Sequence, residues 1–169
     1  MNNVFVSVLM GSDSDLSVLQ ETFNELKQLG IRYEARILSA HRTPSAVVSY
    51  VQEADQRGCA VFIAAAGLAA HLAGAVAANT IKPVIGIPLD TGSLGGIDAL
   101  LATVQMPGGT PVACTSIGKA GAKNAAHLAA QILAITDKAI ADKLNALREE
   151  KRDALRNADK KLQAETAHS

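Results

Sequence analysis

Short apolar, β-branched runs alternate with helix-forming segments along this chain. The apolar runs cover residues 4–10, 33–38, 60–65, 84–89 and 112–116, with helix-length segments between them. Consecutive strands that are connected by a helix usually run parallel, because the helix returns the chain to the end of the sheet at which the previous strand began. We therefore expect an α/β fold, a three-layer αβα sandwich around a five-stranded parallel sheet. A flavodoxin-like strand order, 2-1-3-4-5, is the arrangement we expect for five strands.

The composition predicts one folded α/β unit without a nucleic-acid or membrane partner. The chain has 169 residues, of which 49% are hydrophobic, and its formal net charge is zero. Aromatic residues make up only 3%, so the stacking rings of nucleic-acid binders are missing. The zero net charge gives no sign of the basic surface that such proteins need. Residues 60–78 are apolar but interrupted by Gly67, His71 and Gly74, which favours a strand, a turn and a helix over a membrane span. With no signal peptide evident, we expect a cytoplasmic location.

The C-terminal segment differs in composition from the rest of the chain. Residues 137–165 hold nearly half of the charged residues, almost balanced in sign, around a narrow apolar stripe. The stripe consists of Ile140, Leu144, Leu147, Leu155 and Leu162. Such a segment is either a solvated terminal helix or an arm that packs on another subunit. We favour the arm, and divide the chain into an α/β catalytic domain (residues 1–136) and a C-terminal helix that packs on a neighbouring subunit (residues 137–169).

The loops that follow the strands predict where the functional site lies. In a parallel sheet these loops gather at the carboxyl edge, and ligands bind there. They cover residues 11–15, 39–44, 66–74, 89–96 and 116–121, and glycine, serine, histidine and arginine concentrate in them. Topology and composition therefore point to the same edge of the sheet.

The first of these loops, GSDSD at residues 11–15, suits a phosphate or a ribose. Its glycine allows close backbone approach, and the hydroxyls of Ser12 and Ser14 lie at a helix N-terminus. Ordinary helix capping would explain the same residues. The loop lacks the Gly-Lys-Ser/Thr ending of an ATP-binding P-loop and the glycine spacing of a dinucleotide site. ATP hydrolysis and nicotinamide chemistry are therefore not expected.

The second loop, SAHRTP at residues 39–44, combines an imidazole with a guanidinium. His41 can move a proton near neutral pH, and Arg42 can hold a phosphate through two donors. Thr43 is expected to cap the next helix, with Pro44 as its first residue.

The remaining histidines and cysteines carry weaker signals. His71 lies among small residues after the third strand and is either a hydrogen-bonded core residue or a second histidine of the site. We expect His127 and His168 to be structural or exposed, and Cys59 and Cys114 to be reduced thiols in apolar surroundings. No His, Cys, Asp or Glu residues have metal-ligand spacing, so no metal is expected. These residues alone fit a phosphosugar isomerase, a lyase or a nucleotide-binding module. A flavin carrier is a different class, disfavoured because the edge loops lack Trp and Tyr.

Five motifs also resemble a known family. In order they are GSDSD (11–15), SAHRTP (39–44), AGLAAHL (66–72), VQMP (104–107) and IGKAGAKNAA (117–126). They are similar to motifs of the N5-carboxyaminoimidazole ribonucleotide mutases of purine biosynthesis, class I of the bacterial type, and the similarity extends to about residue 133. The alternative is the related carboxylase that uses CO2 directly, which is expected to have Lys-Gly where this chain has Arg42 and Thr43.

The resemblance implies a reaction, a set of roles and an assembly. A carboxylate would move from the exocyclic nitrogen of an aminoimidazole ribonucleotide to ring carbon C4, by decarboxylation and recarboxylation and without a cofactor. His41 would be the general acid–base. The implied substrate contacts are Ser12, Ser14, Ser39 and Arg42 for the phosphate, Asp15 for the ribose, and Gly67 and Leu72, with His71, around the carboxylate or CO2. The family is a homo-octamer whose C-terminal helix reaches a neighbouring subunit. Ala73 stands where the family is expected to have proline, which predicts a more mobile loop.

Overall fold

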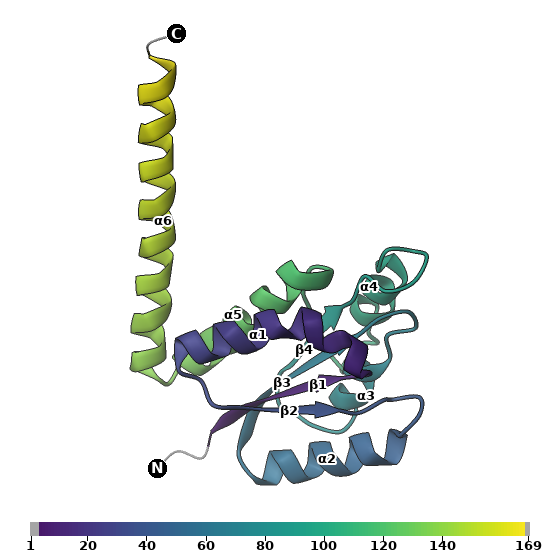
Figure 1. Cartoon of the computed structure of the whole chain (residues 1–169). Helices are drawn as coiled ribbons and strands as arrows, with labels where there is room; N and C mark the ends of the chain where they lie inside the picture. The colour runs from purple at the N-terminus through teal and green to yellow at the C-terminus, as the bar shows by residue number, and fades with distance from the viewer. Residues whose placement is uncertain (1–3, 168–169) are drawn as a thin grey trace.

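Five parallel strands form one sheet in the order β2-β1-β3-β4-β5 in the computed structural model, which describes residues 4–167 (Figure 1). This order confirms the flavodoxin-like topology that the sequence predicts. The strands are β1 (Phe5–Met10), β2 (Tyr33–Ile37), β3 (Cys59–Ala66), β4 (Val84–Pro88) and β5 (Ala113–Cys114). β5 is shorter than the predicted run of residues 112–116. It lies at the edge of the sheet and pairs only with Ile85 and Gly86 of β4.

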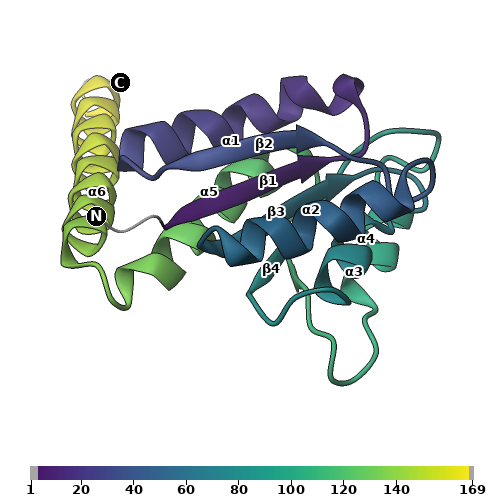
Figure 2. The same ribbon diagram turned by 90° about the horizontal axis from the view of Figure 1, so that it is seen from below.

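Helices cover both faces of the sheet, which confirms the three-layer sandwich. They are α1 (Leu16–Leu29), α2 (Pro44–Gln56), α3 (Leu72–Ala77), α4 (Ile97–Val104) and α5 (Gly118–Ala134), and a 3-10 turn, η1 (Asp13–Asp15), precedes α1. α1 and α5 lie over one face, and α2 and α3 lie over the other (Figure 2). α3 ends before the expected limit near Thr80, because the Asn79 side chain donates to the Ala75 carbonyl at 2.8 Å and turns the chain back.

Two apolar cores lie on either side of the sheet. Along β1, Phe5 and Leu9 are buried in the core under α2 and α3, whereas Val6 and Val8 are buried in the core under α1 and α5. This alternation follows from the two-residue period of a strand. The core under α1 and α5 depends on small side chains of α5, which let that helix approach α1 closely. They are Ala122, Ala125, Ala126, Ala129 and Ala130.

Polar contacts also join α1 to α5. The Thr22 hydroxyl, fully buried, donates to the Ala122 carbonyl at 2.9 Å. His127 Nε2 lies 3.0 Å from Glu25 Oε2. The expectation of a structural role therefore fits His127, and His168 lies outside the described residues.

The last helix, α6 (Lys138–Thr166), is anchored at one end only. Asp137 caps it by accepting from the backbone N–H groups of Ala139 and Ile140, and Leu144 is 6% exposed against the α1–α5 core. Residues 148–166 are exposed and extend away from the sandwich (Figure 1). Over residues 4–167, no helix is both long enough and apolar enough to span a membrane.

Candidate active site

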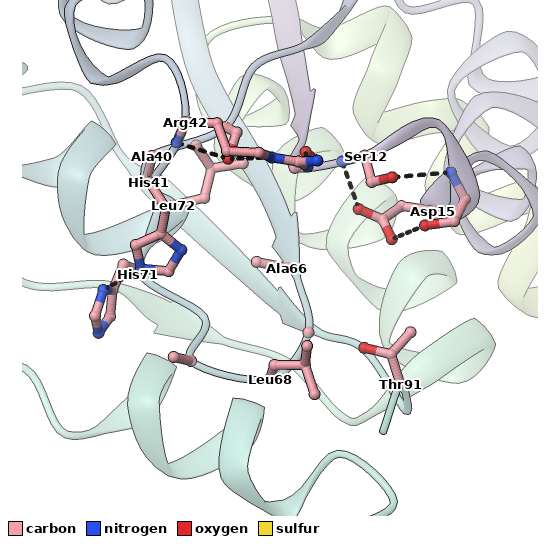
Figure 3. A pocket seen from close by; sticks show the side chains of 15 residues that line it. Ser12, Asp15, Ala40, His41, Arg42, Ala66, Leu68, His71, Leu72 and Thr91 are labelled. Atoms are coloured by element: carbon pink, nitrogen blue, oxygen red, sulfur yellow. Dashed lines mark hydrogen bonds between the residues drawn. The ribbon is translucent and has the colours of Figure 1, made fainter. Parts of the chain in front are cut away.

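A cavity of about 520 Å³ opens at the carboxyl edge of the sheet, where the strand order predicts it (Figure 3). Its walls come from the loops after β1, β2, β3 and β4. They consist of Gly11, Ser12, Ser14, Asp15, Ser39, Ala40, His41, Arg42, Ala66, Gly67, Leu68, Ala69, His71, Leu72 and Thr91. All nine site residues predicted from the sequence therefore line one cavity.

The GSDSD loop is held in shape by Asp15. The Asp15 carboxylate accepts from the Ser12 backbone N–H at 3.0 Å and from the Ser14 hydroxyl at 3.3 Å. The Ser12 hydroxyl in turn accepts from the Ser14 backbone N–H at 3.3 Å, which completes a capping box. Asp15 is only 7% exposed, and this burial raises the pKa of its carboxyl. Capping and ligand binding are therefore compatible here, since the capped turn still presents its hydroxyls to the cavity.

Arg42 connects the first two loops. Its Nη2 donates to the Gly11 carbonyl at 2.7 Å, and its Nε donates to the Ser39 hydroxyl at 3.3 Å. The other guanidinium N–H groups donate to no residue among 4–167, and Figure 3 shows the guanidinium beside Ser12 at the cavity wall. A planar cation with several donors in this position suits a phosphate.

Thr43 shapes the second loop in a way that the sequence did not predict. Pro44 is the first residue of α2, as expected, and Thr43 occupies the N-cap position. The Thr43 hydroxyl does not cap the helix, however, because it bonds to the backbone of Ser39, accepting from its N–H and donating to its carbonyl at 3.1 Å each. This closes the loop between the two residues and presents His41 at its tip.

His41 and His71 form a pair across the cavity mouth. His41 Nε2 lies 2.7 Å from His71 Nδ1, and the two rings meet edge to face with centroids 4.6 Å apart. One ring must donate and the other must accept, so a single hydrogen lies between the two nitrogens. His71 is thus an exposed partner of His41 and not a core residue.

Leu68 and Thr91 are among the lining residues that sequence reasoning did not name as site residues. Leu68 has φ +55°, a left-handed backbone conformation. The Thr91 side chain lies against Gly67, so closely that a Cβ on Gly67 would overlap the Thr91 hydroxyl oxygen. Neither residue type carries a sequence signal for such a role, because both contacts depend on how two loops meet in space.

The predicted fifth loop, residues 116–121, does not reach the cavity. Gly121 is required by backbone packing, since a Cβ there would overlap the Ser116 carbonyl oxygen. Lys123 pairs with Glu21 of α1 at 3.3 Å. This loop therefore has a structural task in joining α5 to the sheet. Within residues 4–167, no three His, Cys, Asp or Glu side chains are grouped closely enough to hold a metal ion.

Both the sequence and the fold of this chain are similar to those of known proteins. Residues 5–154 match the model of the AIR carboxylase family. The chain is 52% identical to N5-carboxyaminoimidazole ribonucleotide mutase of Saccharolobus solfataricus over 148 residues, covering 88% of this chain and 92% of that protein. It is 50% identical to the Bacillus subtilis mutase over 155 residues, covering 91% and 96%. The crystal structure of Treponema denticola PurE superposes with a TM-score of 0.86 at 34% identity, covering 95% and 99%.

Proposed function

Because the chain belongs to the AIR carboxylase family, we propose that it is an N5-carboxyaminoimidazole ribonucleotide mutase, an isomerase of purine biosynthesis. The observation that carries this proposal is the composition of one cavity. It combines a histidine pair with a serine loop and an arginine suited to a phosphate. The relatives with the highest identities above carry the mutase name.

The polar side of the cavity would hold the ribonucleotide. Ser12, Ser14, Ser39 and Arg42 would bind the phosphate, since their hydroxyls and guanidinium lie together at a helix N-terminus. Asp15 would accept from the ribose hydroxyls with the lone pairs that its own loop does not use. The backbone around Gly67 and Leu72 would enclose the carboxylate, next to His71.

His41 would then move one proton in each half of the reaction. In the first half the carbamate N–C bond breaks, its electron pair stays on nitrogen, and protonated His41 gives that nitrogen a proton, leaving aminoimidazole ribonucleotide and CO2. In the second half C4 attacks the carbon of CO2, and the proton on C4 passes to His41. The imidazole ends as it began, so the cycle balances without a metal or a cofactor.

Direct use of CO2 is the closest alternative, and Arg42 and Thr43 argue against it. Both residues have definite tasks here, since Arg42 links two loops and Thr43 closes the SAHRTP turn. Lys-Gly, expected in the carboxylase, would provide neither the guanidinium fork nor the hydroxyl. A flavin carrier is disfavoured because no Phe, Tyr or Trp lines the cavity.

One assay separates these possibilities. Carboxyaminoimidazole ribonucleotide is measured from the carbamate substrate, and separately from aminoimidazole ribonucleotide with bicarbonate. We expect turnover of the carbamate at low bicarbonate. Turnover only of the second mixture would replace the mutase assignment with the carboxylase, and a flavin absorbance in the purified protein would favour the carrier.

The role of His41 is tested in the same assay. His41→Asn should lower kcat by about 10²–10⁴-fold, the typical contribution of a positioned acid–base. Binding of aminoimidazole ribonucleotide, measured by calorimetry, should persist. His127→Asn is the matched control, because His127 contacts Glu25 away from the cavity. Wild-type turnover by His41→Asn would remove this residue from the mechanism.

The assembly and location are part of this proposal. We propose a cytoplasmic homo-octamer in which the C-terminal helix packs on a neighbouring subunit. In support, Leu155 and Leu162 on the free part of α6 are 72% and 59% exposed. Light scattering should give an octamer for the full chain and a smaller species for Leu155→Lys combined with Leu162→Lys. An octamer in both samples would contradict the helix contact.

A further inference from the structure

Leu68 is unusual because a large apolar side chain is exposed at the cavity and its backbone is left-handed. It lines the cavity and is 55% exposed. Its φ of +55° makes it the one non-glycine residue with positive φ within residues 4–167. A left-handed conformation is unfavourable for leucine, and such strain persists only where the surroundings impose it.

Leu68 is held in this conformation by the loop that follows β4. The Leu68 side chain lies on Gly92, where a Cβ would overlap Leu68 Cδ2. The Thr91 side chain lies on Gly67 in the same way. Each loop thus places a side chain on the glycine of the other, and this reciprocal contact fixes the Leu68 side chain at the cavity.

Leu68 belongs to an apolar side of the cavity. Figure 3 shows Leu68 and Thr91 across from Arg42, with Ala66 between them. The other apolar lining residues are Ala40, Ala69 and Leu72. Small alanines leave room for a compact ligand, and Leu68 is the one large exposed side chain among them.

We propose that Leu68 is the residue that retains CO2 between the two half-reactions. This inference rests on the function proposed above. CO2 is small, without net charge and without hydrogen-bond donors, so polar groups hold it only weakly and an apolar wall is needed to keep it from escaping. The loop contact keeps that wall in place while nitrogen is released and C4 turns towards CO2. The Leu68 side chain has no group that can donate or accept a proton, so it would act on retention and not on proton transfer.

Loss of the wall should uncouple the two half-reactions. The N–C bond would still break and His41 would still give its proton, because the groups for that step remain. CO2 would then diffuse away before C4 attacks it, and aminoimidazole ribonucleotide would accumulate. The two products report on one branch point, so their ratio measures retention independently of the overall rate.

The experiment follows both products from the carbamate substrate in 13C-bicarbonate, with the rate without enzyme subtracted. Leu68→Gly removes the wall and the backbone strain together. Leu68→Asn tolerates the left-handed conformation but makes the wall polar. Leu94→Ala is the matched control, because Leu94 is 62% exposed near the same loop without lining the cavity.

We expect both Leu68 variants to raise the ratio of released to carboxylated product about tenfold, which corresponds to about 1.4 kcal/mol of lost retention. They should also incorporate 13C into the carboxylated product, and Leu94→Ala should resemble the wild type. An unchanged ratio in Leu68→Gly, or in Leu68→Asn if the glycine variant does not fold, would overturn the inference alone. A parallel fall of both products would overturn it too, since that indicates a structural role. Wild-type enzyme that forms no carboxylated product from the carbamate would overturn the proposed function, and the inference with it.

Discussion

Replacing Gly67 with alanine adds one methyl group at the point where two cavity loops meet. The new Cβ would overlap the Thr91 hydroxyl oxygen and lie 3.0 Å from Thr91 Cβ and 3.6 Å from Leu89 Cβ. The last distance is ordinary van der Waals contact, so only Thr91 obstructs the methyl group. Gly67 does not have a positive φ, and alanine therefore carries no backbone penalty there. The loop with Thr91 must move away, and it takes with it Gly92, the support of Leu68.

The size of the effect follows from that geometry. Inserting a methyl group into a packed contact typically costs about 1–3 kcal/mol. At about 2–4 °C per kcal/mol for a domain of this size, the melting temperature should fall by roughly 2–12 °C. The ratio of released to carboxylated product should rise as in the Leu68 variants, because the apolar wall loses its support.

A rescue series distinguishes this steric cause from a direct need for glycine at position 67. In the Gly67→Ala background, Thr91→Ala removes the overlapping oxygen but leaves the 3.0 Å contact, so it should recover part of the product ratio. Thr91→Gly removes both contacts and should recover most of it. Gly108→Ala is the control, since a Cβ there meets nothing within 4 Å and its φ is not positive.

The assay is a double-mutant cycle on the product ratio and on the melting temperature. We expect Thr91→Gly to be more harmful alone than in the Gly67→Ala background. Additive effects of the two substitutions would refute the argument, since they would show that the methyl group and Thr91 do not collide. Wild-type behaviour of Gly67→Ala would refute it directly.

Three further predictions concern other groups. His71→Ala should lower kcat at least about tenfold, because His41 loses its hydrogen-bond partner. His71→Asn should recover most of the loss, since its amide can replace Nδ1 in the bond to His41. Equal losses in the two variants would show that His71 does more than orient His41. Arg57 donates to the Glu34 carboxylate at 2.6 and 2.8 Å and holds the pKa of Glu34 below its ordinary value. Glu34→Gln should therefore lower the urea midpoint at pH 7, and the difference in midpoint from the wild type should vanish as the pH falls through the lowered pKa of Glu34. A difference that stays constant with pH would contradict the pairing. Burial raises the pKa of Cys59 to about 12, so Ellman's reagent at pH 8 should modify Cys59 only on unfolding, after the less buried Cys114. Fast reaction of both thiols in the native protein would contradict the protection of Cys59.

The sheet could be predicted from the sequence because its central strands, β1, β3 and β4, are buried on both sides. Runs such as residues 60–65 are apolar throughout, and the helices between them dictate a parallel arrangement. Prediction was least accurate at the margins. β5 pairs on one side only and forms just Ala113–Cys114, and α3 stops where the Asn79 side chain competes with the helix.

The position of the cavity was predictable as far as topology decides it. The strand-end rule brought His41 and His71 to one edge from positions 30 residues apart. It overestimated the loop at residues 116–121, because being at the right edge does not ensure contact with the cavity. It placed the loops that contain Leu68 and Thr91 at this edge but singled out neither residue, because their positions depend on the contacts of Thr91 with Gly67 and of Leu68 with Gly92. Ala73 is the second residue of α3 and 3% exposed, a first-turn position at which proline would also be tolerated.

The pairing of α1 with α5 has a consequence for the synthesis of the chain. Thr22 and Ala122, which bond across the core, are separated by 100 positions. Every residue that lines the cavity, up to Thr91, leaves the ribosome before α5 does. A nascent chain therefore contains the whole site while the α1 side of its sheet still exposes apolar surface, the state in which unfinished proteins aggregate. Between Thr91 and residue 167 the chain contributes no residue to the cavity, yet we expect the growing polypeptide to be prone to aggregation until this part emerges and α5 covers the sheet.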